Sequence, residues 1–363
     1  MNGEQTERHD TIVIGGGQAG LAMGYYLAQA RRDFVILDEN PRVGDVWRNR
    51  WDSLRLFTPA RYNRLPGMRI PALPGSYPTK DQMADFLEAY AERFELPVRT
   101  GTRVEGVRRN GKSFLVTSGA RTWEADNVVV AIGAYHAPRI PAFADRLDEG
   151  IVQLHSSDYR NLSQLAPGET LVVGAGNSGA EISMEAAREH ATWLSGRDTG
   201  EEPVSASGTL KDRLITPLIW FAASRVFKVT NPIGRKVREH FLDPPRGVPL
   251  ARVRRQEILD AGIERVPRTV GVEAGAPKLE DGRVLDVRNV VWCTGFRADF
   301  GWIDGLETGE YGMPVHERGV VPSQPGLYFM GLLFQYTLAS ALVGGVGQDA
   351  RYIAERITTN HAA

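Results

Sequence analysis

The stretch "TIVIGGGQAG", residues 11–20, decides the fold of this chain. A short, largely apolar run leads directly into Gly15, Gly17 and Gly20, which have the spacing G-x-G-x-x-G. Continuous apolar runs of this kind are typical of parallel strands buried on both faces. In a strand–turn–helix unit the first glycine permits the tight turn, the second lets a pyrophosphate approach the backbone, and the third lets helix and strand pack closely. The stretch therefore predicts a dinucleotide-binding turn.

The residues that follow support this interpretation. "LAMGYYLAQARR" (21–32) has the composition of a helix, and the next apolar run, "DFVILDE" (33–39), places Asp38 eighteen residues after Gly20. An acid at this distance accepts hydrogen bonds from ribose hydroxyls, and the helix N-terminus faces the phosphates. The alternative is an ordinary glycine-rich turn that binds no ligand. Such a turn would not require a strand before it, a helix after it and an acid at this spacing. The first site suits FAD or NAD.

A second copy of the same pattern occurs at "LVVGAGNSGA", residues 171–180, with Gly174, Gly176 and Gly179 at the glycine positions. Eighteen residues after Gly179 the chain has Arg197 in place of an acid. An arginine attracts the 2′-phosphate of NADPH, which an acid would repel. Ser195 is a second candidate phosphate donor. The second site is therefore predicted to bind NADPH, the alternative being that Arg197 is a solvated charge at a strand end.

Composition excludes several classes of protein. The net charge is −1, so no overall field attracts nucleic acid. Cys293 is the only cysteine, which excludes internal disulfides and a CxxC redox pair; we expect it to be buried and inert. The N-terminus is polar, and the most apolar run, 214–229, is too short for a membrane span. We expect a cytoplasmic protein without an integral membrane segment, in which 214–229 forms a surface-lying amphipathic helix or a substrate-side lid.

The predicted fold class is α/β, with two Rossmann-like dinucleotide-binding domains. We expect a first domain over 1–160, an inserted domain over 161–285, and a return to the first domain over 286–363. Within the first part we expect a helix whose N-terminus has a capping box formed by Thr79 and Gln82, then a β-meander and a buried strand. Apolar strands resume at 289–296 and 326–335, and a final helix is expected from about Leu338.

Several further motifs carry a family resemblance that covers nearly the whole chain. Together with the paired glycine loops, they make the chain similar to the flavin-containing monooxygenases, in particular the short bacterial members and the YUCCA-like indole-pyruvate monooxygenases. The motifs are "VGDVW" (43–47), "DSLRLFTP" (52–59), "YPTKDQMADFLEAYA" (77–91), "VVVAIGAYHAPRIP" (128–141), "GAGNSGAE" (174–181) and "WCTGF" (292–296).

The chain also departs from the family pattern. In "EGIVQLHSSDY" (149–159) the family's His and Tyr are present as His155 and Tyr159, but Glu149 stands at the position of its Phe. Phe57 and Ala60 stand where relatives have an asparagine and a lysine beside the flavin. No catalytic side chain is therefore assigned. We expect His136 and His155 to be structural hydrogen-bonding residues.

The glycine loops and the resemblance together imply two groups of cofactor-binding residues and no metal site. FAD is assigned to Gly15, Gly17, Gln18, Ala19, Gly20, Asp38, Glu39, Trp47, Arg48, Thr58, Gly133, Gly295, Gly331, Leu338 and Ala339. NADPH is assigned to Gly174, Gly176, Asn177, Ser178, Gly179, Ser195 and Arg197. Candidates beside the flavin ring are Phe57, Thr58, Gln335 and Ser340. The positive end of the final helix is expected near flavin N1 and C2=O.

The function implied is that of a monooxygenase that uses FAD and NADPH to insert one oxygen atom of O₂ into a small organic substrate through a C4a-(hydro)peroxyflavin. A reductase or oxidase that passes NADPH electrons on without oxygen insertion is the main alternative. A non-catalytic NADPH-sensing regulator is the third hypothesis. A homodimer is the working hypothesis for the oligomeric state.

Overall fold

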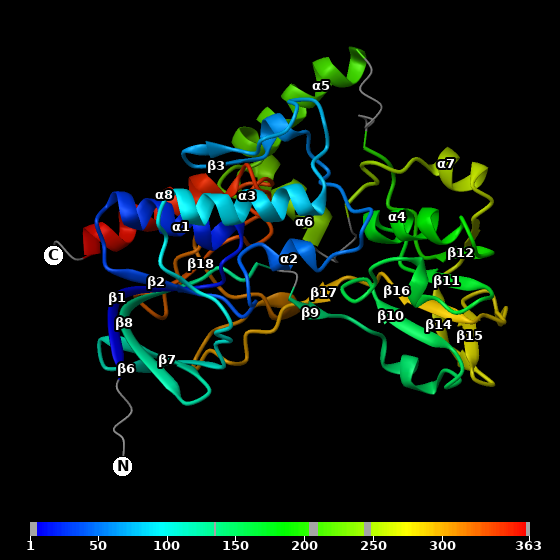
Figure 1. Cartoon of the computed structure of the whole chain (residues 1–363), viewed down its shortest axis with the longest axis horizontal. Helices are drawn as coiled ribbons and strands as arrows, with labels where there is room; N and C mark the ends of the chain where they lie inside the picture. The colour runs from blue at the N-terminus through cyan, green and yellow to red at the C-terminus, as the bar shows by residue number, and fades with distance from the viewer. Residues whose placement is uncertain (1–5, 134–135, 203–209, 243–247, 361–363) are drawn as a thin grey trace.

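The computed structural model describes residues 6–133, 136–202, 210–242 and 248–360. They form two α/β units that lie side by side (Figure 1), each built on its own sheet. The first sheet has seven strands in the order β5-β2-β1-β8-β7-β6, with β18 paired to β8. These strands are β1 (Glu7–Ile14), β2 (Phe34–Leu37), β5 (Val98–Arg99), β6 (Gly106–Asn110), β7 (Ser113–Ser118), β8 (Arg121–Val130) and β18 (Leu327–Phe329).

The centre of the first sheet is parallel, as the continuous apolar runs predict. β1 pairs in parallel with β2 and β8, and β18 pairs in parallel with the last residues of β8. β6, β7 and the first half of β8 form the expected antiparallel meander. One face of the sheet is covered by the helices α1 (Gln18–Gln29), α3 (Lys80–Arg93) and α8 (Val346–Asn360) (Figure 1). A short helix α2 (Asp45–Arg48) and the two-stranded β3 (Arg64–Leu65) and β4 (Met68–Arg69) follow β2.

The capping box predicted for the long helix is confirmed. Thr79 is the N-cap of α3, and its hydroxyl accepts a hydrogen bond from Gln82 N at 3.2 Å. The Gln82 side chain accepts in return from Thr79 N at 3.0 Å. Two backbone donors that a helix start leaves open are thereby satisfied.

The second sheet has five parallel strands in the order β10-β16-β11-β12-β13. They are β10 (Val152–His155), β11 (Thr170–Val173), β12 (Thr192–Ser195), β13 (Glu264–Val266) and β16 (Asn289–Trp292). Helices α4 (Asn177–Ala186) and α7 (Arg255–Asp260) and the hairpin β14 (Thr269–Glu273)–β15 (Ala276–Leu279) complete this unit. Between β12 and α7 the chain forms a helical hairpin. It consists of α5 (Leu210–Phe221), a π-helical turn (Ala222–Val226) and α6 (Pro232–Leu242).

The predicted domain boundaries 161 and 286 need correction. β10 precedes residue 161 and β16 follows residue 286, yet both pair in the second sheet. The chain crosses between the units at β9 (Ala137–Pro138) and β17 (Phe296–Arg297), which pair antiparallel. A buried parallel strand has the same apolar pattern in either sheet, so its residues alone do not show which sheet it joins.

The expected start of the final helix near Leu338 is also wrong, because α8 begins at Val346. Residues 337–345 form successive turns instead, in which Ser340 N bonds Thr337 O at 3.1 Å and Leu342 N bonds Ala339 O at 2.9 Å. The Ser340 hydroxyl accepts from the backbone N–H groups of Tyr336 and Thr337, and such local bonds compete with helix formation. The positive end of α8 is therefore not at residues 338–340.

Candidate functional site

The first glycine loop has the geometry that its spacing predicts. Gly15 adopts φ +105°, and a Cβ atom on it would lie 2.9 Å from Ala131 O. A Cβ on Gly20 would lie 1.8 Å from Gly15 O, so only glycine permits this contact between helix α1 and the turn. A Cβ on Gly17 would meet nothing within 4 Å, and no side chain caps α1 at this residue. The loop thus leaves open space beside uncapped backbone N–H groups, as a pyrophosphate requires.

The second loop repeats this geometry. Gly174 adopts φ +111°, and its Cβ would lie 2.2 Å from Cys293 O. The Cβ of Gly179 would lie 1.7 Å from Gly174 O, whereas that of Gly176 would meet nothing within 4 Å. No side chain caps α4 at Gly176 either. Both loops therefore fit a dinucleotide phosphate. Glycines at equivalent positions of the two motifs have equivalent surroundings.

Asp38 lies where the first site needs an acid. It directly follows β2, is buried, and its carboxylate accepts hydrogen bonds from Gly16 N in the glycine loop and from Asn40 N at 2.8 Å. These bonds fix the carboxylate beside the loop and leave lone pairs for ribose hydroxyls. Glu39, by contrast, is exposed and lies 3.8 Å from Arg103 in a surface ion pair.

Arg197 is exposed just after β12, and within the described part of the chain its guanidinium has no hydrogen-bond or ion-pair partner. The prediction that the nearby Ser195 donates a hydrogen bond to the phosphate is wrong, because its hydroxyl is buried and already bonded within the protein. Ser195 is fully buried, and its hydroxyl donates to Pro267 O at 2.8 Å and accepts from Thr269 N at 2.9 Å. The hydroxyl is needed to join β12 to the start of β14, and it faces the interior.

The side chains of Asn177 and Ser178, the other predicted residues of the second loop, differ in their surroundings. The amide side chain of Asn177 accepts from Ala251 N at 2.8 Å and donates to Pro249 O at 3.1 Å, so it joins α4 to the segment 248–251. Only its backbone N–H remains available to a phosphate. Ser178 is half-buried at the first turn of α4. Cys293 lies under this loop; it is half-buried, not fully buried as expected, and desolvation raises the pKa of its thiol, which disfavours the reactive thiolate.

Three predicted FAD residues from distant parts of the chain meet at the first loop. A Cβ on Gly331 would lie 3.0 Å from the Cβ of Ala19 and 3.9 Å from Gly133 Cα. Gly133 follows β8 and Gly331 follows β18, so the carboxyl ends of two paired strands lie against the first turn of α1. Gln18, at the start of α1, is half-buried.

Gly295 belongs to the crossing between the domains. Its carbonyl accepts from Arg139 N and lies 3.0 Å from His155 Nε2. The other imidazole nitrogen of His155 lies 2.8 Å from the Ser157 hydroxyl, and burial lowers the pKa of this histidine. His136 Nε2 lies 3.1 Å from Asp299 N. Both histidines are structural hydrogen-bonding residues, as predicted.

Trp47 and Arg48 lie on α2 at the edge of both units. The Trp47 ring packs against the apolar cores of the first and second units. The Arg48 guanidinium is engaged with carboxylates, at 3.2 Å from Asp45, 3.0 Å from Asp85 and 2.9 Å from Glu88. Its side chain ties α2 to α3, so a flavin contact would have to come from its backbone.

The loop after α2 contains two of the predicted flavin neighbours. Phe57 has 53% of its surface exposed, and the Thr58 hydroxyl donates to Asn63 Oδ1 at 2.6 Å. Asn63 was not predicted; it is buried, and its Nδ2 donates to Thr58 O at 2.8 Å. Ala60 is buried nearby. Asn63 thus holds the turn that presents Phe57, and nothing in the adjacent sequence marks it for this role.

The candidates beside the flavin ring from the C-terminal part lie in one buried loop. Gln335 accepts from Leu332 N through Oε1, and its buried Nε2 has no hydrogen-bond partner among the described residues. Leu338 N donates to Phe227 O and Ala339 N donates to Ala223 O, both at 3.2 Å. Ser340 is buried as well. This loop therefore lies directly against the α5–α6 hairpin.

A polar contact between the two units was missed by sequence reasoning. The Ser53 hydroxyl, in the first unit, donates to Glu185 Oε2 on α4 at 2.6 Å. One turn away Arg252 Nη1 lies 3.4 Å from Glu181 on the same helix and donates to Arg55 O at 3.3 Å. Burial raises the pKa of Glu181 to about 7. No local pattern marks these residues, because their partners are more than seventy residues away in the chain.

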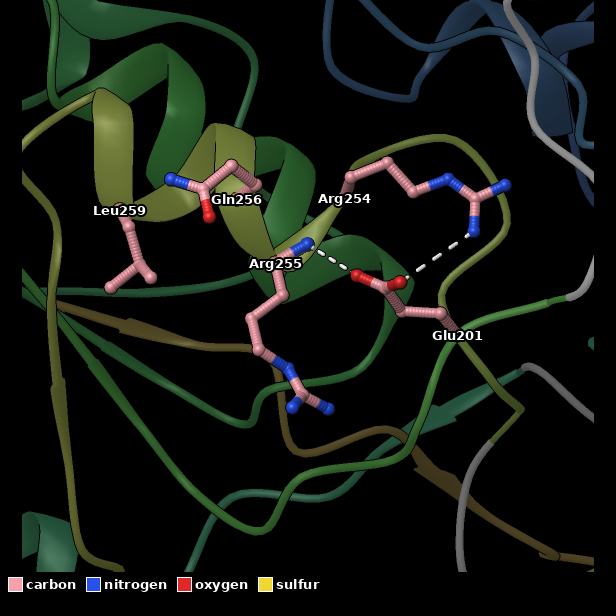
Figure 2. A pocket seen from close by; sticks show the side chains of 5 residues that line it. All are labelled: Glu201, Arg254, Arg255, Gln256 and Leu259. Carbon is pink, nitrogen blue, oxygen red and sulfur yellow. Dashed lines mark hydrogen bonds and ion pairs between the residues drawn. The ribbon is translucent and has the colours of Figure 1, made fainter.

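A surface pocket of about 480 Å³ lies at the start of α7 (Figure 2). It is lined by Glu201, Arg254, Arg255, Gln256 and Leu259. Glu201 accepts from Arg255 N and pairs with Arg254 at 3.8 Å, so its charge is locally compensated. Among the described residues no cluster of His, Cys, Asp and Glu could hold a metal ion, and no helix is long and apolar enough to cross a membrane.

The comparisons with known proteins match this geometry. The family model for pyridine nucleotide-disulphide oxidoreductases matches residues 12–215. An oxidoreductase described as CzcO-like from Geobacillus kaustophilus is 41% identical over 97% of this chain and 99% of its own length. The chain belongs to the pyridine nucleotide-disulphide oxidoreductase family. It is an enzyme of the flavoprotein type, and membership implies use of a flavin and a nicotinamide cofactor.

Two further relatives confirm the resemblance to flavin-containing monooxygenases. The flavin-containing monooxygenase from Stenotrophomonas maltophilia has a solved structure with a TM-score of 0.78 and 27% identity, and the match covers 98% of this chain and 100% of that one. The probable indole-3-pyruvate monooxygenase YUCCA7 of Arabidopsis thaliana is 26% identical over 88% of this chain and 82% of its own length. The predicted two-unit α/β fold is confirmed as well.

Proposed function

We propose that this protein is an FAD- and NADPH-dependent monooxygenase that inserts one atom of O₂ into a small organic substrate. The observation that carries the proposal is the pair of glycine loops with matching geometry, one followed by the buried acid Asp38 and the other by the exposed Arg197. The monooxygenases among its relatives support the reaction type.

The residues present fit both cofactors. In the first unit the open side of Gly17 and the N-terminus of α1 would bind the FAD pyrophosphate, and Asp38 would accept from its ribose hydroxyls. In the second unit Gly176 and α4 would bind the NADPH pyrophosphate, and the exposed guanidinium of Arg197 would bind the 2′-phosphate. Bound FAD would supply the redox chemistry, accepting hydride from NADPH at N5 and reacting with O₂ at C4a.

The substrate side is apolar in this chain. Phe57 and Ala60 stand where relatives have polar groups, so neither side chain would donate a hydrogen bond to a reacting oxygen. We infer that NADPH oxidation is partly uncoupled, releasing hydrogen peroxide until a substrate fills the site. The protein would act on small molecules.

The test is transfer of labelled oxygen. The flavin-loaded protein is incubated with NADPH and ¹⁸O₂ in the presence of indole-3-pyruvate, a thioether or a tertiary amine, and products are analysed by mass spectrometry. One ¹⁸O atom in a product supports the monooxygenase. Stoichiometric hydrogen peroxide with every compound, and no labelled product, supports an oxidase. A protein that binds NADPH but no flavin would instead be a sensor.

A further inference from the structure

The α5–α6 hairpin, residues 214–242, has an exposed apolar stripe that the proposed function does not use. Leu214, Leu218 and Phe221 lie on one face of α5, and 66%, 68% and 60% of their surfaces are exposed. Pro217, on the same face, is exposed too. In Figure 1 the N-terminal part of α5 projects beyond both units. Three large exposed apolar side chains within eight residues mark an interaction surface.

The opposite face of the hairpin is firmly attached to the protein. The Trp220 ring stacks on Tyr62 with ring centroids 5.0 Å apart, and Ala223 and Ser224 are buried. Val229 N donates to Tyr336 O at 2.9 Å. The exposed stripe is therefore presented from a fixed support, and it is not the unpacked side of a loose segment.

The same hairpin is strongly basic. Residues 214–242 contain five basic side chains and one acidic one, a charge of +4, whereas the whole chain carries −1 and the remainder therefore carries −5. Four of the basic residues are exposed: Arg225, which lies one turn beyond Phe221, and Arg235, Lys236 and Arg238 on α6. Exposed Ile233 lies at the start of α6. The hairpin that carries the apolar stripe is therefore basic as a segment, and Arg225 is the exposed cation nearest to the stripe along the chain.

We propose that the α5–α6 hairpin docks this protein on a bilayer surface that contains anionic lipid. Leu214, Leu218 and Phe221 enter the headgroup region, and the exposed cations of the same hairpin attract the lipid phosphates. Helices that combine a Leu/Phe face with Lys and Arg lie in the membrane interface in this way. The inference goes beyond the proposed function and does not depend on it.

A second copy of the chain is a poorer occupant. Stable protein–protein interfaces cover roughly 800 Å² per partner, which is far more than three side chains expose. In a symmetric dimer each basic hairpin would also face its own copy, and like charges across an interface oppose association.

Vesicle co-sedimentation tests the proposal. The full chain is mixed with vesicles of phosphatidylcholine alone or of phosphatidylcholine with phosphatidylglycerol, at low and high salt. We expect binding to the anionic vesicles that weakens with salt. The variant L214S/L218S/F221S should bind at least about tenfold less, and R235Q/K236Q/R238Q should lose the preference for anionic lipid.

Matched variants elsewhere on the surface control for general effects. L73S removes a more exposed leucine, and R108Q/K112Q/R121Q removes three exposed charges; neither should change binding. Circular dichroism verifies that each variant is folded. Absence of binding by the native chain, or equal binding by the apolar triple variant, would overturn the proposal. So would a native dimer that becomes monomeric in the triple variant without vesicle binding, since a second copy would then be the occupant.

Discussion

Arg252 and Glu181 form an ion pair where the two units meet. Arg252 Nη1 lies 3.4 Å from both carboxylate oxygens of Glu181, a long contact for opposite charges. The pair does not offset the desolvation of the carboxylate, because burial raises the pKa of Glu181 to about 7 despite the arginine. Glu181 therefore gains and loses its proton near neutral pH and not in the acid range usual for a glutamate.

This pKa makes stability depend on pH. Between the ordinary value of 4.5 and about 7 the folded chain binds the proton and the unfolded chain does not, so stability falls as pH rises through this window. The full effect is at most about 3 kcal/mol. Glu181→Gln should remove it, and urea unfolding at several pH values measures it. Glu239→Gln, at an exposed site on α6, is the control; identical pH curves for the native chain and Glu181→Gln would contradict the prediction.

The open sides of Gly17 and Gly176 predict two separable defects. Gly17→Val should give folded but colourless protein, because the new side chain would occupy the space of a pyrophosphate without meeting any protein atom. Gly176→Val should keep the yellow flavin and lose NADPH reduction. Absorbance at the flavin band and anaerobic reduction distinguish the two cases.

Gly75 provides the control for these variants, since a Cβ there also meets nothing within 4 Å but lies on a loop outside both sites. Gly75→Val should retain flavin and reduction. Full flavin content in Gly17→Val would show that the first loop does not hold the cofactor.

Arg197 is predicted to set the choice of nicotinamide cofactor. Arg197→Ala should raise the Michaelis constant for NADPH by about ten- to a hundredfold, since a charge-assisted pair contributes on the order of 1.5–3 kcal/mol, and should leave NADH little changed. Steady-state kinetics with both cofactors gives the ratio. Arg188→Ala, at an exposed site beyond the end of α4, should change neither value. Equal losses with NADPH and NADH would assign Arg197 a structural role.

The capping box of α3 predicts a purely structural effect. Thr79→Ala removes the acceptor for Gln82 N and should lower the free energy of unfolding by about 1 kcal/mol. Chemical denaturation measures the change. Thr100→Ala, at an exposed site without a cap, should be neutral. A neutral Thr79→Ala would mean that solvent replaces the cap at no cost.

The features that the sequence predicted correctly are local. The close contact between Gly20 and Gly15, that between Gly179 and Gly174, the bond from Gly16 to Asp38 and the cap at Thr79 each join residues that are near in the chain, so their spacing largely determines the local geometry. The direction in which a polar side chain points at the end of a strand could not be predicted from the sequence. Ser195 could face the nucleotide or the interior, and the partner that decides it, Thr269, lies 74 residues away.

The remaining errors concern contacts across the fold. The pairing of β10 and β16 depends on which sheet has a free edge, a property that no single segment encodes. The ion pairs of the Arg48 guanidinium with Asp85 and Glu88 of α3 were not predicted either, because their partners lie about forty residues away in the chain. The contact between Ser53 and Glu185 joins segments of different units and leaves no trace in either one alone.

The crossing at β9 and β17 has a consequence for biosynthesis. A ribosome delivers the chain from its N-terminus, so the inserted second unit is complete while the first still lacks β18 and α8. Until residues 327–360 emerge, the second half of β8 has an unpaired edge and α1 lacks the helix that packs on it. The nascent first unit therefore exposes strand edge and apolar surface for the time needed to translate the whole insert, and this is the interval in which chaperones would be needed most.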